Sequence, residues 1–224
     1  MIKAFIFGSC RIWDTTNFCA QLNIRTLMHD ISQYIQEIQF YRSTKSISNQ
    51  DENMKYMYYN NYRTLLTNQK ETILQSQLDS VNSADIIIVE ICTLKYIQVN
   101  DVYYDLQMCA KYKNLISAIK KYDEKLFLEK MEQFIKMLPN KKILFVGHIY
   151  DKERMAGTKL EVRKILNGWI SKSVDNINTH FLDLSSLFET HTYEKIMSDT
   201  EHYSKVGKKI IRSKLKTVLA NLLN

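Results

Sequence analysis

The chain has 224 residues, of which 45% are hydrophobic and 25% charged, as in a globular protein that buries a substantial core. A single proline and five glycines exclude collagen-like and low-complexity structure. No apolar run approaches the roughly 20 residues that a membrane-spanning helix needs, so no membrane span is predicted. The formal charge of +7 favours encounters with anionic partners, but the lysines are scattered and do not indicate a groove for nucleic acid.

The cysteine pattern bears on the compartment. Cys10, Cys19, Cys92 and Cys109 show no CxxC spacing and no dense framework, so we expect reduced thiols rather than disulfides. The first apolar run, residues 2–7, has no basic stretch before it and predicts a strand rather than a signal peptide. Together these features predict a cytoplasmic protein.

Five short apolar runs predict the strands of one sheet. The third and fourth are nearly continuous aliphatic runs, which is typical of parallel strands buried on both faces. The predicted strands are residues 3–7, 37–41, 85–91, 142–146 and 179–182.

Amphipathic patterns between these runs predict helices over residues 17–36, 51–78, 123–138, 158–174 and 204–223. The alternation of strand and helix predicts the α/β class, with residues 1–224 forming a single doubly wound, flavodoxin-like domain that has helices on both faces. Residues 93–122 form a longer connection than a simple loop, and we expect them to form a cap. Ligands of such sheets bind at the carboxyl ends of the strands, which directs attention to the residues that follow each strand.

The first strand ends in Gly8-Ser9-Cys10-Arg11. Glycine permits a sharp turn, and the start of the following helix supplies unpaired N–H groups that favour a thiolate or an oxyanion. Ser9 or Cys10 could therefore act as a nucleophile. The alternative is that Ser9 only caps the helix and Cys10 is a small buried residue.

A second motif, Asp199-Thr200-Glu201-His202, precedes the last predicted helix. An acid three residues before a histidine can reach the imidazole Nδ1 and fix its tautomer, which leaves the other nitrogen free to act as a base. The alternative is that Asp199 or Ser204 caps the final helix and His202 is an ordinary surface residue.

The two motifs together resemble the first and last sequence blocks of the SGNH (GDSL-like) hydrolase superfamily. Members typically show Gly-Asp-Ser after the first strand and Asp-x-x-His, with a following glycine (here Gly207), near the C-terminus. The Gly-Ser-Cys turn is similar to branches that include capsular polysaccharide biosynthesis proteins of the acyl or acetyl transfer type. The resemblance implies a triad of Cys10, His202 and Asp199, with Ser9 as the reserve nucleophile, because alignment on Gly8 puts Cys10 at the nucleophile's position.

The sequence departs from the superfamily where the oxyanion hole is expected. No glycine lies between Gly8 and Gly147, and no Asn follows the third predicted strand. An oxyanion donor contributes roughly 3–4 kcal/mol to transition-state stabilisation, so a substitute is needed. The Cys10 backbone N–H, the Thr93 hydroxyl and an amide near Ser43 are the candidates.

Two further residues lie at the ends of predicted strands. Glu90 ends an aliphatic run, where a carboxylate needs a partner, and Arg11 or Lys95 could supply it. His148 could line a pocket or be a satisfied structural histidine. We include Gly8, Arg11, Ser43, Glu90, Thr93, Lys95 and His148 among the predicted oxyanion- or substrate-binding residues.

The sequence lacks the common metal-binding and nucleotide-binding motifs. The histidines show no HxxxH or HExxH spacing, so no metal is predicted, and there is no Walker A or GxGxxG pattern. No cofactor is required by the predicted chemistry, although acyl-CoA would suit it as a donor substrate.

Three functions remain as hypotheses. The first is an acyl-group enzyme that hydrolyses a small-molecule or carbohydrate ester, or transfers an acyl (acetyl) group to a carbohydrate hydroxyl. The second is a non-catalytic ligand-binding module on the same fold, motivated by the missing oxyanion blocks. The third, a nucleic-acid-binding protein, is motivated only by the charge.

Overall fold

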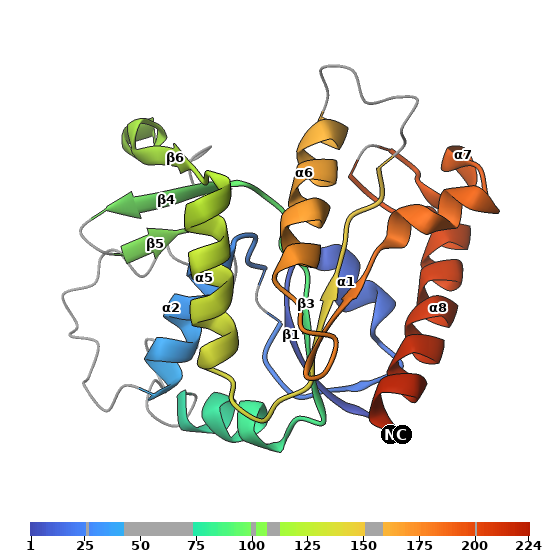
Figure 1. The fold of residues 1–224 in the computed structure, drawn as a ribbon, viewed down its shortest axis with the longest axis horizontal. Coiled ribbons are helices and arrows are strands. Elements are labelled where there is room, and N and C mark those ends of the chain that lie inside the picture. The colour runs from blue at the N-terminus through green and yellow to red at the C-terminus, as the bar shows by residue number, and fades with distance from the viewer. Residues whose placement is uncertain (26, 43–73, 100–101, 107–112, 151–158, 200) are drawn as a thin grey trace.

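The computed structural model describes residues 1–25, 27–42, 74–99, 102–106, 113–150, 159–199 and 201–224. Ser43 and most of the helix predicted over 51–78 lie outside these ranges. Residues 74–83, which begin inside the end of that predicted helix, are helical. The described residues form an α/β fold around a five-stranded sheet in which all neighbours are parallel (Figure 1). None of the helices in these ranges combines the length and apolar character needed to cross a bilayer.

The order of the strands confirms the predicted fold class. Across the sheet they run β2-β1-β3-β7-β8, which is 2-1-3-4-5 when the five are counted along the chain, as in flavodoxin-like folds. Their bounds are β1 Lys3–Phe7, β2 Ala20–Gln21, β3 Ile86–Val89, β7 Ile143–Val146 and β8 Thr179–Leu182. The chain turns to opposite sides of the sheet from β1 and β3, so the carboxyl ends of these two strands mark the position where a ligand is expected.

Helices cover both faces of this sheet (Figure 1). One face carries α2 (Ile31–Arg42), α5 (Glu124–Lys136) and α6 (Lys159–Lys172), and the other carries α1 (Cys10–Thr15) and α8 (Lys205–Leu223). Along β1, Phe5 and Phe7 belong to the core under the first group of helices, whereas Ala4 and Ile6 belong to the core under the second. Because both faces are buried, the strand is apolar at every one of these positions.

The prediction of a strand over residues 37–41 is wrong. These residues belong to α2, and the edge strand of the sheet is β2, which lies inside the helix predicted over 17–36. Within α2, Tyr34, Ile38 and Tyr41 are buried at helical spacing, so a short apolar run that could have been either element is part of a longer helical face. The strand β2 has two residues, too few to show any alternation.

The segment 93–122 contains a second, antiparallel sheet of order β5-β4-β6. Its elements are β4 Lys95–Val99, β5 Val102–Tyr104, the 3-10 helix η2 Lys113–Ala118 and β6 Ile119–Lys121. Tyr96, Tyr104 and Tyr122 join the core that lies under α2 and α5. The small sheet lies beside α2 and α5, away from α8 (Figure 1). Its role as a cap over a ligand remains a prediction.

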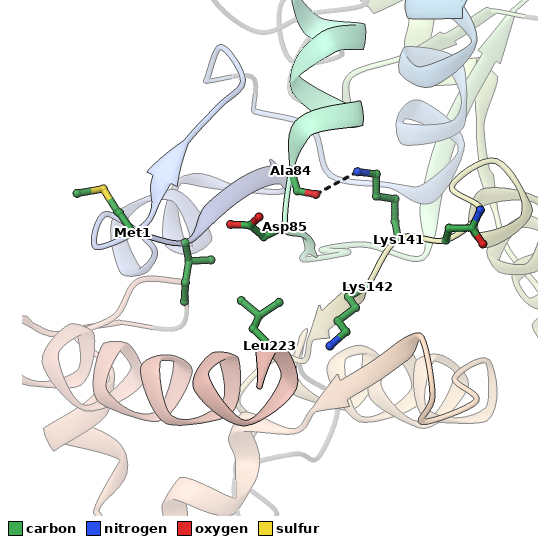
Figure 2. Close-up of a pocket in the computed structure, with 8 residues that line it drawn as sticks. Met1, Ala84, Asp85, Lys141, Lys142 and Leu223 are labelled. Carbon is green, nitrogen blue, oxygen red and sulfur yellow. Dashed lines mark hydrogen bonds between the residues drawn. The ribbon is translucent and has the colours of Figure 1, made fainter.

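The two ends of the chain meet at the amino edge of the main sheet, where the N and C labels lie together (Figure 1). A pocket of about 550 Å³ opens there, lined by residues that include Met1, Asp85, Lys142 and Leu223 (Figure 2). In the same pocket the Lys141 ammonium donates to the carbonyl of Ala84 at 3.0 Å. This pocket lies at the edge of the sheet opposite the carboxyl ends of the strands.

A buried carboxyl group connects the small sheet to α2. Asp30 Oδ1 accepts hydrogen bonds from the backbone N–H groups of Ser32 and Gln33 and from the Tyr122 hydroxyl, at 2.9, 3.2 and 2.9 Å. Its other oxygen, Oδ2, is buried and has no hydrogen-bond partner among the described residues. Burial raises the pKa of Asp30 to about 7.

We expect this raised pKa to make stability depend on pH. Because the folded protein keeps a proton on Asp30 that the unfolded chain loses near pH 4, the stabilisation is complete below about pH 4 and is lost as the pH rises to about 7. Asp30→Asn removes the titrating group and keeps an acceptor for the helix. Urea unfolding at pH 5 and pH 8 should show a smaller fall in the midpoint for the variant than for the wild type, and equal falls would contradict the assignment.

Candidate functional site

The turn after β1 depends on Gly8. Its φ angle of 151° lies in a region that side chains rarely adopt. A Cβ at this position would lie 2.7 Å from Ile12 Cγ2 and 2.9 Å from Glu90 Cβ. The glycine therefore lets the end of β1 approach the end of β3 and begin α1 without a clash.

Ser9 and Cys10 have different environments at the start of α1. Ser9 is buried and caps the helix: its hydroxyl donates to Glu90 Oε2 at 2.5 Å and accepts from the Arg11 backbone N–H at 3.3 Å. Cys10 is the first residue of α1 and is a half-buried free thiol. The capping alternative is thus correct for Ser9, whereas Cys10 is the more accessible of the two side chains.

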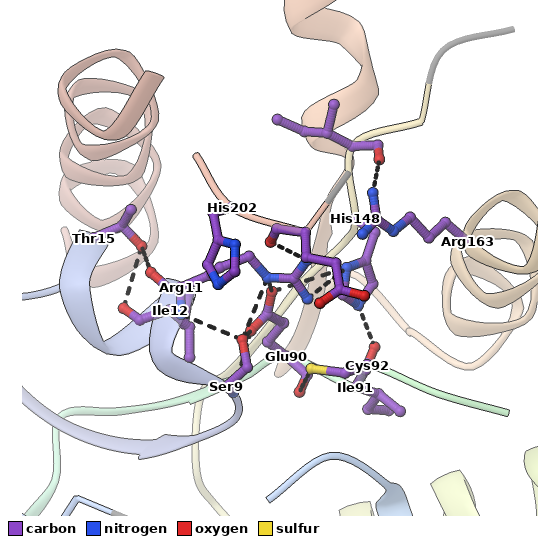
Figure 3. Close-up of polar contacts among 12 residues, drawn as sticks. Ser9, Arg11, Ile12, Thr15, Glu90, Ile91, Cys92, His148, Arg163 and His202 are labelled. Carbon is purple, nitrogen blue, oxygen red and sulfur yellow. Dashed lines mark hydrogen bonds and ion pairs between the residues drawn. The ribbon is translucent and has the colours of Figure 1, made fainter. Parts of the chain in front are cut away.

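Glu90, at the end of β3, is the centre of a buried polar cluster (Figure 3). Arg11 Nε contacts Glu90 Oε1 at 3.1 Å, whereas Lys95 is exposed. Of the two partners that the sequence offered for Glu90, Arg11 is therefore the one that binds it. Burial alone would raise the pKa of Glu90, but the Arg11 cation and the hydrogen bonds from Ser9 lower it to about 2. The same carboxylate keeps the pKa of Arg11 above its usual value, although burial acts in the opposite direction.

His148, which follows β7, is a satisfied structural histidine. The ring is buried, its Nδ1 accepts from Arg11 Nη2 at 3.1 Å, and its Nε2 donates to the Ile91 carbonyl at 2.6 Å. These two contacts define a neutral tautomer that carries its proton on Nε2. Burial lowers the pKa of His148 to about 3, and the adjacent Arg11 cation adds to that effect. A place for His148 in the lining of a ligand pocket remains a prediction.

Potential metal-ligand atoms of Glu90, Cys92 and His148 lie within 4.8 Å of one another. The sequence did not reveal this group, because the three residues follow no recognised metal-binding spacing. The Arg11 guanidinium already contacts Glu90 and His148, so the cation among these side chains is an arginine. A metal ion would have to displace it from a buried carboxylate, and the set does not fit a metal in this arrangement.

The Asp199-x-x-His202 motif forms the predicted acid–histidine pair. Asp199 Oδ2 lies 2.9 Å from His202 Nδ1, and Asp199 Oδ1 accepts from the backbone N–H groups of Glu201 and His202 at 2.6 and 2.7 Å. These hydrogen bonds, first that from the Glu201 N–H, lower the pKa of Asp199 to about 2. The contact places a proton on Nδ1 and leaves Nε2 of neutral His202 as the basic nitrogen. Both side chains are more than half exposed.

The structure brings this motif to the start of the chain. Arg11 Nη1 donates to the Glu201 carbonyl at 3.1 Å, and Arg11 Cζ lies 6.0 Å from the centre of the Tyr203 ring. Figure 3 shows the His202 ring beside the α1 end of the Arg11 cluster. Nearby, Lys208 on α8 forms an ion pair with Asp14 on α1 at 2.7 Å.

Ser204 caps the last helix, which is one of the two caps that the sequence analysis considered. Its hydroxyl accepts from the Gly207 N–H at 2.9 Å. A Cβ on Gly207 would lie 2.0 Å from the Ile196 carbonyl oxygen, so the glycine lets α8 pack closely on the short helix α7 (Tyr193–Ile196). Asp199 bonds to its own loop instead of the helix, which leaves it available to His202.

The other predicted site residues do not join the cluster through described contacts. The Thr93 hydroxyl accepts from the Lys95 backbone N–H at 2.9 Å, and Thr93 is half-buried. Lys95 begins β4 with an exposed side chain. Ser43 lies outside the described residues. The origin of an oxyanion hole therefore remains a prediction.

A second acid–histidine pair lies near the end of β3 and was missed by the sequence analysis. His29 Nδ1 and Asp105 Oδ2 are 3.0 Å apart, and the His29 carbonyl accepts from the Cys92 backbone N–H at 2.8 Å. The two residues are 76 positions apart, so no local motif could have indicated the pairing.

No protein-family model matches the chain, and no curated protein matches it in sequence. Among solved structures, the chain is similar to a carbohydrate esterase family 3 protein from Talaromyces cellulolyticus, with 10% identity, a TM-score of 0.42 and coverage of 100% of this chain and 98% of that one. It is also similar to a mutant acetyl esterase solved with an acetate ion, with 11% identity, a TM-score of 0.43 and the same two coverages. Similarity at this level does not assign a family or an activity.

We expect Glu90→Gln to destabilise the protein strongly. The change removes the carboxylate and leaves the Arg11 cation buried without its counter-charge, and breaking such a pair costs about 3–5 kcal/mol. Chemical denaturation should show a fall of that size in the free energy of unfolding.

Glu132→Gln is the matched control. It breaks an ion pair with Lys136 that is exposed on α5, and we expect a change within about 0.5 kcal/mol. Similar losses for the two variants would show that burial of the Arg11–Glu90 pair has no energetic consequence.

Proposed function

We propose that the chain is an SGNH-like acyl-group enzyme in which Cys10 is the nucleophile, His202 the general base and Asp199 the residue that orients His202. The observation that carries the proposal is the hydrogen bond from Arg11 to the Glu201 carbonyl. It connects the residue after Cys10 to the residue before His202 across almost the whole length of the chain. The Asp199–His202 contact supplies the other half of the arrangement.

Three features favour Cys10 over Ser9 as the nucleophile. The Ser9 hydroxyl is buried and donates its hydrogen bond to Glu90, whose pKa of about 2 makes the carboxylate a poor base. The same hydroxyl oxygen accepts from Arg11, which reduces its nucleophilic character. Cys10 is half-buried, and a thiol is the more reactive group.

The proposed reaction begins with attack of the Cys10 sulfur on the carbonyl carbon of an ester or thioester. His202 Nε2 accepts the thiol proton and then gives it to the departing alcohol or thiol as the carbonyl reforms, which leaves an S-acyl Cys10. The Cys10 backbone N–H at the start of α1 is the proposed donor to the oxyanion. Asp199 stays ionised throughout, since its pKa is about 2, and it stabilises the imidazolium.

The acceptor decides between two outcomes. Attack by water on the S-acyl group would make the protein an esterase, whereas attack by a sugar hydroxyl would make it an O-acyltransferase. The proposed substrates are small-molecule or carbohydrate esters. Acyl-CoA is a further proposed donor, because the positive net charge of the chain favours an encounter with its phosphate groups. No cofactor takes part in this scheme, and a cytoplasmic location remains part of the proposal.

The alternative is a non-catalytic binding module. It is favoured by the cluster of Ser9, Arg11, Glu90 and His148, which satisfies its own hydrogen bonds, and by the lack of the usual oxyanion residues. The alternative expects ligand binding without any acylation of Cys10.

The test is intact-mass measurement after brief incubation with p-nitrophenyl acetate or acetyl-CoA. We expect one acetyl group on the wild type, mapped to Cys10 by peptide sequencing, and none at that position in Cys10→Ala. His202→Ala should slow acylation by about 10²–10⁴-fold, the usual contribution of a general base.

Cys19→Ala is the matched control, because Cys19 is a buried thiol whose pKa burial raises to about 11. This variant should acylate like the wild type. An unmodified wild-type protein, or a label that remains after Cys10→Ala, would refute the proposed nucleophile.

A further inference from the structure

The Arg11 side chain joins four parts of the molecule. Its Nε contacts Glu90 at the end of β3 and Ser9 in the turn, its Nη2 donates to His148 after β7, and its Nη1 donates to the Glu201 carbonyl. The residue is 9% exposed. A guanidinium carries its donors in a fixed planar fork, so the three contacts to residues that follow β1, β3 and β7 define the direction of the fourth.

The protonation states of the cluster are fixed as well. Glu90 is ionised and Arg11 is cationic, while His148 is neutral because its Nε2 donates to Ile91 and its Nδ1 accepts from Arg11. The charges of these three residues therefore sum to zero. No member of the cluster changes its charge near neutral pH, so the orientation of the guanidinium does not depend on pH there.

The His202 loop is ordered mostly by its own contacts. Asp199 accepts from the next residues along the loop, and Ser198 N donates to the His202 carbonyl at 2.9 Å. A hydrogen bond from Arg11 Nη1 to the Glu201 carbonyl connects this loop to the turn after β1. The Tyr203 ring faces the same guanidinium at 6.0 Å.

We propose that Arg11 is a positioning residue that holds the His202 loop at the correct distance from Cys10. The inference rests on the proposed function. Arg11 is adjacent to Cys10 in the first turn of α1, so one rigid backbone unit carries both the nucleophile and the group that binds the loop. Loss of the Nη1 contact removes neither Cys10 nor His202, but it lets the distance between the two side chains vary. A misplacement of about 1 Å can lower the reaction rate about 100-fold.

The experiment measures the rate of Cys10 alkylation by iodoacetamide as a function of pH, with the label mapped to Cys10. It compares the wild type, His202→Ala, Arg11→Lys and the double variant Arg11→Lys/His202→Ala. Lysine keeps a charge beside Glu90 but has one ammonium group and no planar fork. We expect the pH profile of Arg11→Lys to move toward that of His202→Ala. The double variant should be no slower than His202→Ala alone, because both changes disrupt the same pair.

Single-turnover acylation provides a second readout. Arg11→Lys should lower the acylation rate by about 100-fold while KM for the ester changes little. Lys208→Gln is the matched control, since it also removes a basic contact between the two ends of the chain, to Asp14, but does not touch the His202 loop. It should react like the wild type.

The outcomes separate the inference from the proposed function. If His202→Ala alkylates like the wild type, the Cys10–His202 pair itself is refuted. If His202→Ala differs from the wild type but folded Arg11→Lys does not, only the role of Arg11 is refuted. Should Arg11→Lys fail to fold, Arg11→Gln/Glu90→Gln decides, because it leaves no unpaired buried charge and still removes the contact to Glu201.

Discussion

The buried ion pair between Arg11 and Glu90 is the interaction on which the rest of the site depends. A carboxylate at the end of an aliphatic strand is tolerated because a cation and a hydroxyl meet it there. The remaining guanidinium donors must also find partners, and they find a ring nitrogen on the neighbouring strand end and a carbonyl near the C-terminus. Because Arg11 compensates the charge of Glu90, its side chain also connects the ends of β1, β3 and β7 with the loop before α8.

Several predicted site residues contact one another. Arg11, Glu90 and His148, which the sequence placed among the oxyanion- or substrate-binding candidates, are buried and bonded to one another. In the proposed function they support the reacting groups from below, while the half-buried Cys10 and the exposed Asp199–His202 pair are the groups that a substrate would reach. A site with this division can keep its geometry fixed while its outer side chains exchange protons.

The sequence predicted those elements whose pattern is long or chemically unambiguous. The strands near residues 3–7, 142–146 and 179–182 and the last helix follow from continuous apolar runs or from clear amphipathic periodicity. The run at 37–41 was misassigned because five residues do not distinguish a strand from one turn of a buried helix. Within the site, the requirement that Glu90 be paired was predictable, and Arg11 was one of the two candidates. The pairing of His29 with Asp105 was not predictable, because it depends on the tertiary fold.

The close packing of the first and last segments has a consequence for biosynthesis. β1 is an interior strand of the sheet, yet the apolar face formed by Ala4 and Ile6 is covered in part by α8, which leaves the ribosome after every strand of the sheet. Only the short helix α1 can cover part of that face before α8 emerges, and the rest is exposed during this period to misassembly or chaperone binding. The proposed pairing of Cys10 with His202 likewise needs almost the whole chain, so a product truncated after β8 would have the sheet without that pair.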